Sequence, residues 1–301
     1  MLWVVNGLIY GFFTALYLLF NQHYKVDGYI LGIWRGFGIS LLFLPLIFFF
    51  TPPQNIFYWL LLIIQGICIG IYDSHVFFAS ARFGAGPTSR FMTVSVLLTT
   101  FMWWLLTPER FMLLFADSDL FMTLLLVLCA FCVSYWQMLQ SKVSRAAALY
   151  TFPAVIALSV MSIATKYIAE GGKSLGQGLT YYLTVSTFIS GLYNLVGYIR
   201  QERRAKTKMN FAPLFAGSMR KIGIILVAFS SILIVAKTMA LRLAPNPGYV
   251  IALLLVAPLF IYLLNKHYKI ADEIQPEAGF ATIIFLLLLM LVVNGGYGVN
   301  E

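Results

Sequence analysis

Three charged residues lie inside long apolar segments of this 301-residue sequence: Arg35, Asp73 and Lys237. A charged side chain in the middle of an apolar helix costs roughly 2.5–3.5 kcal/mol on membrane-insertion scales, so each such residue is a functional candidate. A buried cation is suited to bind the anionic part of a substrate, and a buried carboxylate is suited to carry a proton. These residues are therefore the first candidates for substrate binding or proton coupling.

The depths of the three residues indicate which of them can meet. At 1.5 Å per helical residue, Arg35 lies about 10 Å from the end of its segment, and Asp73 lies about 13 Å from the same membrane face. These depths allow an ion pair, which would relieve most of the insertion cost. The pair is either a brace between helices or a site in which Arg35 binds a substrate anion or Asp73 carries the coupling proton. Lys237 lies roughly 7 Å from the end of its segment, so it either snorkels to the interface or joins the site.

Four further residues are candidates for a central site. His75 lies two residues after Asp73 and points to a different side of the helix, as a neutral histidine bonded to a neighbour or as part of a proton relay. Tyr72 and Asn194 offer hydrogen bonds either to a substrate or to a neighbouring helix. Trp34 offers an aromatic face to an amphipathic or cationic ligand. No catalytic motif or metal-ligand cluster occurs in the sequence, so we expect neither an enzyme nor a bound metal or cofactor.

The elements that position these residues are predicted to be transmembrane helices. Hydrophobic residues make up 61% of the chain and charged residues only 10%, and the mean hydropathy is +0.88. Soluble proteins carry about 25% charged residues, so the chain is an all-α integral membrane protein. The apolar runs predict ten spans, near residues 2–20, 28–50, 56–81, 86–106, 119–140, 146–168, 178–199, 221–241, 247–265 and 278–295.

The net charge of +9 is explained by the basic residues in the loops between the predicted spans. The odd-numbered loops between the predicted spans hold 14 Lys and Arg residues and the even-numbered loops hold four. By the positive-inside rule, the odd loops are cytoplasmic and both termini are non-cytoplasmic. The absence of an Asn-x-Ser/Thr sequon favours a bacterial inner membrane. We expect the lipid bilayer and a small molecule as partners, no nucleic acid, and either a monomer or a homodimer.

Two segments of the sequence resemble each other at a distance of five spans. Arg82 and Pro87 precede the fourth predicted span, and Arg242 and Pro247 precede the ninth, in both cases 160 residues later. A repeat with an odd number of crossings enters the membrane from the opposite side the second time. The sequence therefore predicts two inverted five-helix repeats, residues 1–140 and 141–301, in one transmembrane domain.

The segment from Ala79 to Arg110 resembles the EamA-type repeat of the drug/metabolite transporter superfamily, and the segment from Ala240 to Lys266, with Pro258-Leu259-Phe260, resembles its second copy. The sequence departs from the family pattern at Pro108-Glu109-Arg110, where the family usually has Gly-Glu-Arg. It also lacks the corresponding acidic residue after the ninth span. The resemblance implies a ten-helix carrier that works by alternating access.

We therefore expect a secondary transporter for a small polar, zwitterionic or anionic metabolite, with or without proton coupling. A flippase for an anionic lipid carrier is the alternative, because a lateral opening would replace a sealed cavity. A membrane-embedded enzyme that modifies lipids is a third reading.

Overall fold

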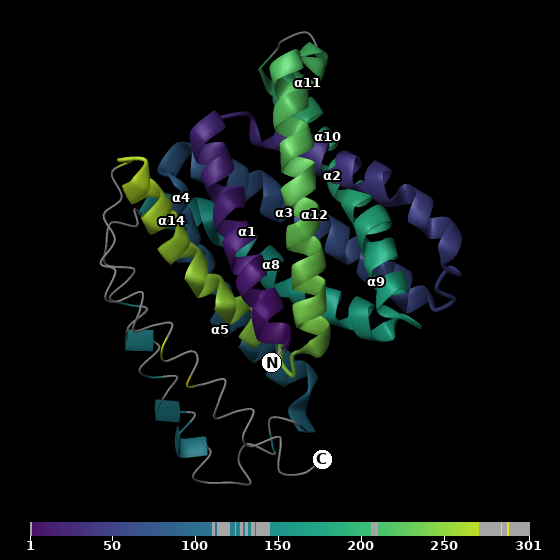
Figure 1. The fold of residues 1–301 in the computed structure, drawn as a ribbon, viewed down its shortest axis with the longest axis vertical. Coiled ribbons are helices and arrows are strands. Elements are labelled where there is room, and N and C mark those ends of the chain that lie inside the picture. Colours follow the sequence, from purple (N-terminus) through teal and green to yellow (C-terminus); the bar gives the residue numbers. More distant parts are fainter. Residues whose placement is uncertain are drawn as a thin grey trace.

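The computed structural model describes residues 2–109, 145–205 and 210–270, together with scattered residues between 112 and 136 and residues 284 and 288. All regular structure in this part of the chain is helical (Figure 1). Seven of its helical segments are long and apolar enough to cross a membrane. They are α1 (Leu2–Tyr24), α2 with η1 (Gly28–Phe43, Leu44–Phe49), α3 (Ile56–Phe83), α4 with α5 (Ala85–Met92, Ser95–Leu106), α8 (Arg145–Gly171), α12 (Gly217–Leu243), and α13, η3 and α14 (Pro247–Ala252, Leu253–Leu255, Val256–His267).

These segments confirm seven of the ten predicted spans, to within four residues at each end. The predicted span 178–199 is also helical: α9 (Leu175–Tyr181), the π-helical η2 (Tyr182–Ser186) and α10 (Thr187–Arg204) follow one another without a break. Its last helix ends in a charged run, which sets it apart from the apolar seven. Only scattered residues of 119–140 and 278–295 are described, so these two spans stay predictions.

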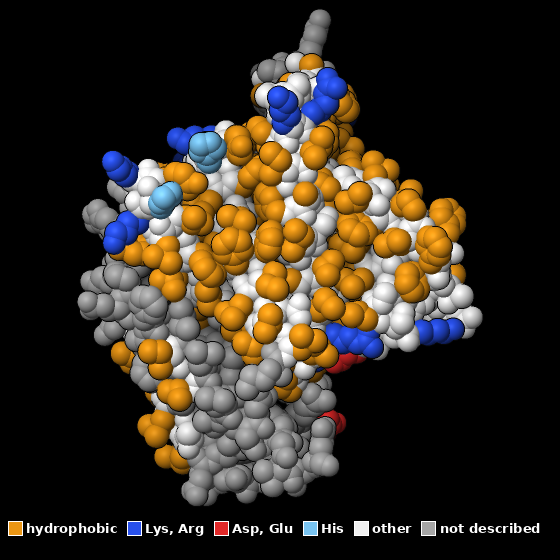
Figure 2. Space-filling view, in the orientation of Figure 1, with side chains coloured by type: hydrophobic (Ala, Val, Ile, Leu, Met, Phe, Trp, Pro, Cys, Tyr) orange, Lys and Arg blue, Asp and Glu red, His pale blue; other side chains and the backbone are white. Residues whose placement is uncertain are grey.

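The helices turn their polar residues inward and their apolar residues outward. On α1, the residues Tyr10, Thr14, Tyr17 and Asn21 recur every three or four positions, and all are buried. The opposite side of α1 is apolar and exposed, and it carries Leu2, Val5, Leu8, Ile9 and Phe12. Figure 2 shows apolar side chains over most of the visible face. Since lipid offers no hydrogen-bond partner, this polarity is the one that a membrane-spanning bundle requires.

Capping residues fix the depth of the charged residues. The side chain of Asp27 accepts hydrogen bonds from the backbone N–H groups of Tyr29 and Ile30, so α2 begins two turns before Arg35. Asn55 caps α3 in the same way. Gly84 ends α3 with a φ of 90°, a left-handed conformation that glycine adopts without a steric cost.

Basic side chains gather at one end of the molecule (Figure 2). We call this the basic end, and it comprises the segments that follow α1, α3, α10 and α14. It carries Lys25, Arg82, Arg200, Arg203, Arg204, Arg220, Lys221, Lys266 and Lys269. The far end comprises the start of α1 and the segments that follow α2, α5, α8 and α12. This grouping agrees with the predicted clustering of odd loops at one membrane face.

Helices from the two halves of the chain pack against each other. α3 packs chiefly along α8, α2 along α10, and α1 along α12, and α1 and α12 lie side by side in Figure 1. Several spans depart from a regular α-helix: α4 and α5 are separated by a turn at Thr93 and Val94, and the helical segments η1, η2 and η3 follow or join α-helices in three other spans. Thr93 and Leu253, the first residue of η3, are 160 residues apart.

Glycine allows the closest approach between α2 and α10. A Cβ atom added to Gly36 would overlap the backbone of Gly191 and would lie 2.8 Å from the carbonyl oxygen of Thr187. These two helices carry Arg35, Ser190 and Asn194. The approach therefore determines how the central polar residues face each other.

We expect Gly36→Ala to lower the free energy of unfolding by roughly 1–3 kcal/mol, because the added methyl group must push two backbones apart. Gly217→Ala is the control, since nothing lies within 4 Å of a Cβ atom at that position. Thermal unfolding of the detergent-purified variants measures the difference. Equal midpoints for the two variants would contradict the close packing of α2 and α10.

Candidate functional site

An ion pair lies at the centre of the helices, as the depths in the sequence predicted. Nη1 of Arg35 on α2 lies 2.5 Å from Oδ2 of Asp73 on α3. Arg35 is 4% exposed and Asp73 is 0% exposed. Taking two charges out of water is costly, so the pair depends on further hydrogen bonds to the remaining lone pairs.

Hydroxyl groups supply these hydrogen bonds. Tyr17 on α1 donates to Oδ1 of Asp73 at 2.6 Å, and Ser190 on α10 donates to Oδ2 at 3.4 Å. The guanidinium carbon of Arg35 lies 5.4 Å from the centroid of the Tyr17 ring. The ring of Tyr72 on α3 stacks on the ring of Tyr17, with the two centroids 6.3 Å apart. Four helices thus meet at one carboxylate.

Lys237 is the third charge of this region. It is 1% exposed, and its Nζ has no hydrogen-bond partner among the described residues. Nζ lies 5.8 Å from the centroid of the Tyr10 ring, and Lys237 is near enough to Arg35 and Asp73 for their charges to act on it. The snorkelling interpretation of Lys237 is therefore wrong, because the side chain stays inside the bundle. Its depth along α12 was close to the interface, but its side of the helix faces the other helices.

We call Arg35, Asp73 and Lys237, with the hydroxyl groups of Tyr17 and Ser190, the central cluster. It holds two basic side chains and one carboxylate, so one basic group is in excess. Nε of Arg35 is a second buried nitrogen without a hydrogen-bond partner in the described part of the chain. An anion that entered the central cluster would find these two nitrogens available as donors.

Two predicted residues lie near the central cluster and two lie elsewhere. Tyr72 contacts Tyr17 directly. Asn194 is buried one turn after Ser190, and its Oδ1 has no hydrogen-bond partner. His75 bonds to the carbonyl oxygen of Ile71 on its own helix, away from Asp73. Trp34 donates its Nε1–H to the carbonyl oxygen of Leu214, which ties α2 to the segment before α12.

Sequence reasoning missed three tyrosines and a serine. Tyr10 and Tyr17 belong to the buried polar stripe of α1, and Tyr182 is buried on η2. Ser190 belongs to a similar stripe on α10, with Thr187, Asn194 and Tyr198. The signal was the spacing of polar residues at three and four positions within otherwise apolar helices. That spacing marks the side of a membrane helix that faces the bundle.

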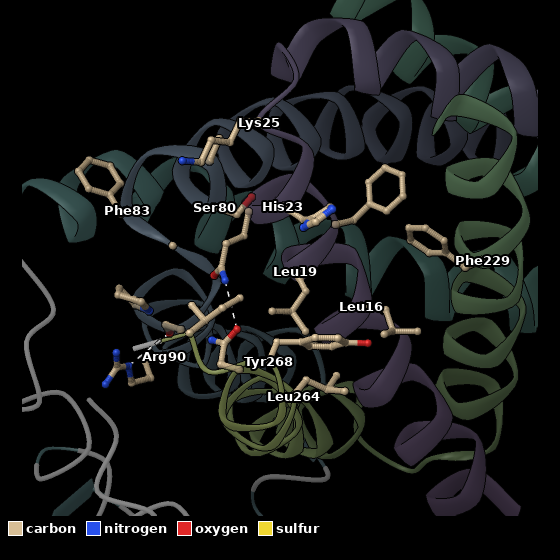
Figure 3. A pocket seen from close by; sticks show the side chains of 18 of the residues that line it. Leu16, Leu19, His23, Lys25, Ser80, Phe83, Arg90, Phe229, Leu264 and Tyr268 are labelled. Atoms are coloured by element: carbon tan, nitrogen blue, oxygen red, sulfur yellow. Dashed lines mark hydrogen bonds between the residues drawn. The ribbon is translucent and has the colours of Figure 1, made fainter. Parts of the chain in front are cut away.

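A cavity of about 1150 Å³ opens at the basic end. It is lined by side chains from α1, α3, α4, α12 and α14, and Figure 3 shows His23, Lys25, Phe229 and Tyr268 around it. One aromatic layer separates this basic-end cavity from the central cluster: the Phe229 ring lies 6.4 Å from that of Tyr17.

The far end is held together by Lys166 of α8. Its Nζ donates to the carbonyl oxygens of Leu241 and Ala244 at the end of α12, at 3.2 and 2.7 Å. It also pairs with Glu170 at 2.7 Å and lies over the ring of Trp103. Lys166 is 2% exposed, so its side chain is buried among these partners. It joins α8, α12 and α5.

Neither the models of known protein families nor the curated proteins that were compared match this chain. Within the described residues, no three His, Cys, Asp or Glu side chains gather where they could hold a metal ion. The function is therefore argued from the central cluster, the basic-end cavity and the far-end contacts.

We expect Asp73→Asn to lower the free energy of unfolding by about 3–5 kcal/mol, because it leaves Arg35 buried without a counter-charge. The double variant Arg35→Met/Asp73→Asn should regain most of this loss, since it removes the unpaired cation as well. Thermal unfolding in detergent measures both.

Glu170→Gln is the control, because this carboxylate is 45% exposed and its pair should contribute less than about 1 kcal/mol. A wild-type unfolding midpoint for Asp73→Asn would show that the ion pair does not hold the helices together.

Proposed function

We propose that the protein is a carrier that moves a small anionic metabolite across the membrane by alternating access. The observation that carries the proposal is a second buried basic side chain, Lys237, beside the Arg35–Asp73 pair. An unpartnered ammonium inside a bundle is costly, and a bound anion would remove that cost. A purely structural brace needs Arg35 and Asp73, but it does not need Lys237.

We further propose that the two halves form inverted repeats, on the plan of the EamA-type carriers that the sequence resembles. In this arrangement α1 of the first half corresponds to α8 of the second half. In the same way α3 corresponds to α12, and α2 corresponds to the span that ends with α10. The packing of α3 along α8 then corresponds to the packing of α12 along α1, and the α2–α10 contact corresponds to itself. The matching interruptions at Thr93 and Leu253 support the same relation.

In this proposal the described conformation is open at the basic end and closed at the far end. The basic-end cavity is the entrance, with the Phe229–Tyr17 contact between it and the central cluster. Lys166 holds the far end closed by binding the last carbonyl groups of α12. By the positive-inside rule the basic end is cytoplasmic, so this conformation faces inward.

Binding of the anion would change the contacts of Asp73. An anion that pairs with Arg35 and Lys237 competes with Asp73 for the guanidinium. Release of Asp73 would loosen its hydrogen bonds to α1 and α10. Because α1 and α12 pack along each other, a shift of α1 would reach both the cavity and the helix that Lys166 holds.

We expect Lys237→Met to reduce anion uptake at least tenfold, on the order of the loss of one charged contact, while leaving the unfolding temperature equal or higher. Methionine fills a similar volume without a buried charge, which explains the opposite effects on uptake and stability. Uptake of labelled carboxylates and phosphorylated metabolites into proteoliposomes, with and without a pH gradient, measures transport.

Lys173→Gln, an exposed cation at the far end, is the control and should transport like wild type. If Lys237→Met transported anions at the wild-type rate, or if no anion of the panel entered the proteoliposomes, the proposed function would be wrong.

We expect Lys166→Gln to open the far end. Without the ammonium, the contacts to Leu241 and Ala244 are lost, and α8 is free to separate from α12. On a cysteine-free background, Ser162→Cys lies one turn from Lys166 toward the centre and is buried. A membrane-impermeant thiol reagent added at the far end should label it at least about tenfold faster when Lys166 is replaced, for a loss of roughly 1.5–3 kcal/mol of charged hydrogen bonding.

Ala81→Cys lines the basic-end cavity and is partly exposed, so it should be labelled from the opposite side already in the parent protein. Equal labelling of Ser162→Cys with and without Lys166 would contradict the role of this lysine in closing the far end.

A further inference from the structure

We propose that the basic-end cavity binds an anionic membrane phospholipid, with its phosphate at the rim and its acyl chains against α1 and α12. The same cavity is the entrance in the proposed transport, and its lining supports lipid binding whether or not the protein transports an anion.

The lining has a charged part and an apolar part. His23 and Lys25 stand at the end of α1, and Figure 3 shows both beside the cavity. Neither side chain makes a hydrogen bond or an ion pair with the described residues. No Asp or Glu is among the described residues that line the cavity. The site therefore attracts an anion and does not repel it.

The apolar part is continuous with the membrane-facing side of α1. The exposed residues of α1 recur at three or four positions, through Ile9 and Phe12, and Leu16 and Phe20 continue the same stripe into the cavity. His23 is the next position of that stripe. Across the cavity, Ile225 of α12 is 50% exposed. The apolar stripe of α1 thus runs from the exposed side of the helix into the cavity and ends at the basic side chains of His23 and Lys25.

A phospholipid matches a site with basic side chains at one end and an apolar lining along the rest, because it has an anionic phosphate and apolar acyl chains. The volume of about 1150 Å³ exceeds the roughly 300–1,000 Å³ of sites for drug-sized ligands, so there is room for acyl chains. Anionic phospholipids also attract basic residues at the cytoplasmic membrane surface, by about 1 kcal/mol per Lys or Arg. A small soluble anion would use His23 and Lys25 but would leave Leu16, Phe20 and Ile225 without contact.

A bound lipid would also contact the wall that faces the central cluster. Phe229 lies at the back of the cavity and touches the ring of Tyr17, which holds Asp73. An acyl chain would therefore support the position of α1. The lipid would favour the conformation that is open at the basic end.

Native mass spectrometry of the purified full-length protein tests this binding directly. Phosphatidylglycerol should bind at least fivefold more tightly than phosphatidylcholine, and millimolar inorganic phosphate should not displace it. The variant His23→Gln/Lys25→Asn should lose at least fivefold in affinity for phosphatidylglycerol. Asparagine is chosen because Lys25 has a φ of 50°, a left-handed conformation that asparagine tolerates.

Lys269→Asn is the matched control, because Lys269 is also at the basic end with a φ of 55° but does not line the cavity. Leu16→Trp fills the apolar part and should weaken phosphatidylglycerol binding with all charges intact. Each variant is first checked by size-exclusion chromatography.

Equal affinity for the two lipids, equal losses for the Lys25 and Lys269 variants, or displacement by phosphate alone would overturn the proposal. None of these results would contradict the proposed transport, because native mass spectrometry measures lipid binding and not transport.

Discussion

The structure depends on the burial of one carboxylate among membrane helices. Asp73 has no contact with water and is held by Arg35, Tyr17 and Ser190, which come from three other helices. Inside a bilayer an unpaired carboxylate is costly, so α1, α2 and α10 are constrained to bring these groups to α3. The glycine contact between α2 and α10 gives the backbones the closeness that this arrangement requires.

The central cluster holds one carboxylate and two basic side chains. Asp73 pairs with Arg35, and Lys237 lies over the ring of Tyr10. The two ends of the bundle differ. The basic end has a cavity whose lining residue Phe229 packs against Tyr17, whereas at the far end Lys166 binds the last carbonyl groups of α12. The proposed alternating access would use this difference between the ends and the buried lysine between them.

The sequence predicted how deep in the membrane a residue lies better than it predicted which side of its helix the residue faces. The pairing of Arg35 with Asp73 was predictable because the rise of a helix is fixed, so two residues counted from the same membrane face must lie at similar levels. Depth alone failed for Lys237, since it lies near a span end and yet faces the bundle. Which side of a helix faces its neighbours depends on packing partners distant in sequence, such as Tyr10.

The polar stripes of α1 and α10 show that part of the missing information was present. Tyr17 and Ser190 recur in step with other buried polar residues, and this spacing could have placed them beside Asp73. Their partners could not be assigned, because the contacts join residues 56 and 117 positions apart. The predicted spans 119–140 and 278–295 are described only at scattered residues, so the ten-helix plan stays a prediction.

Pairs of spin labels at the two ends test the central claim most directly. One pair replaces Lys25 and Lys269 at the basic end, and the other replaces Lys173 and Leu243 at the far end. Pulsed electron resonance distances are measured with and without the anion that the proteoliposome panel identifies. Alternating access predicts that the anion shortens the basic-end distance and lengthens the far-end distance in the same sample. Two distances that an effectively transported anion leaves unchanged would contradict the account.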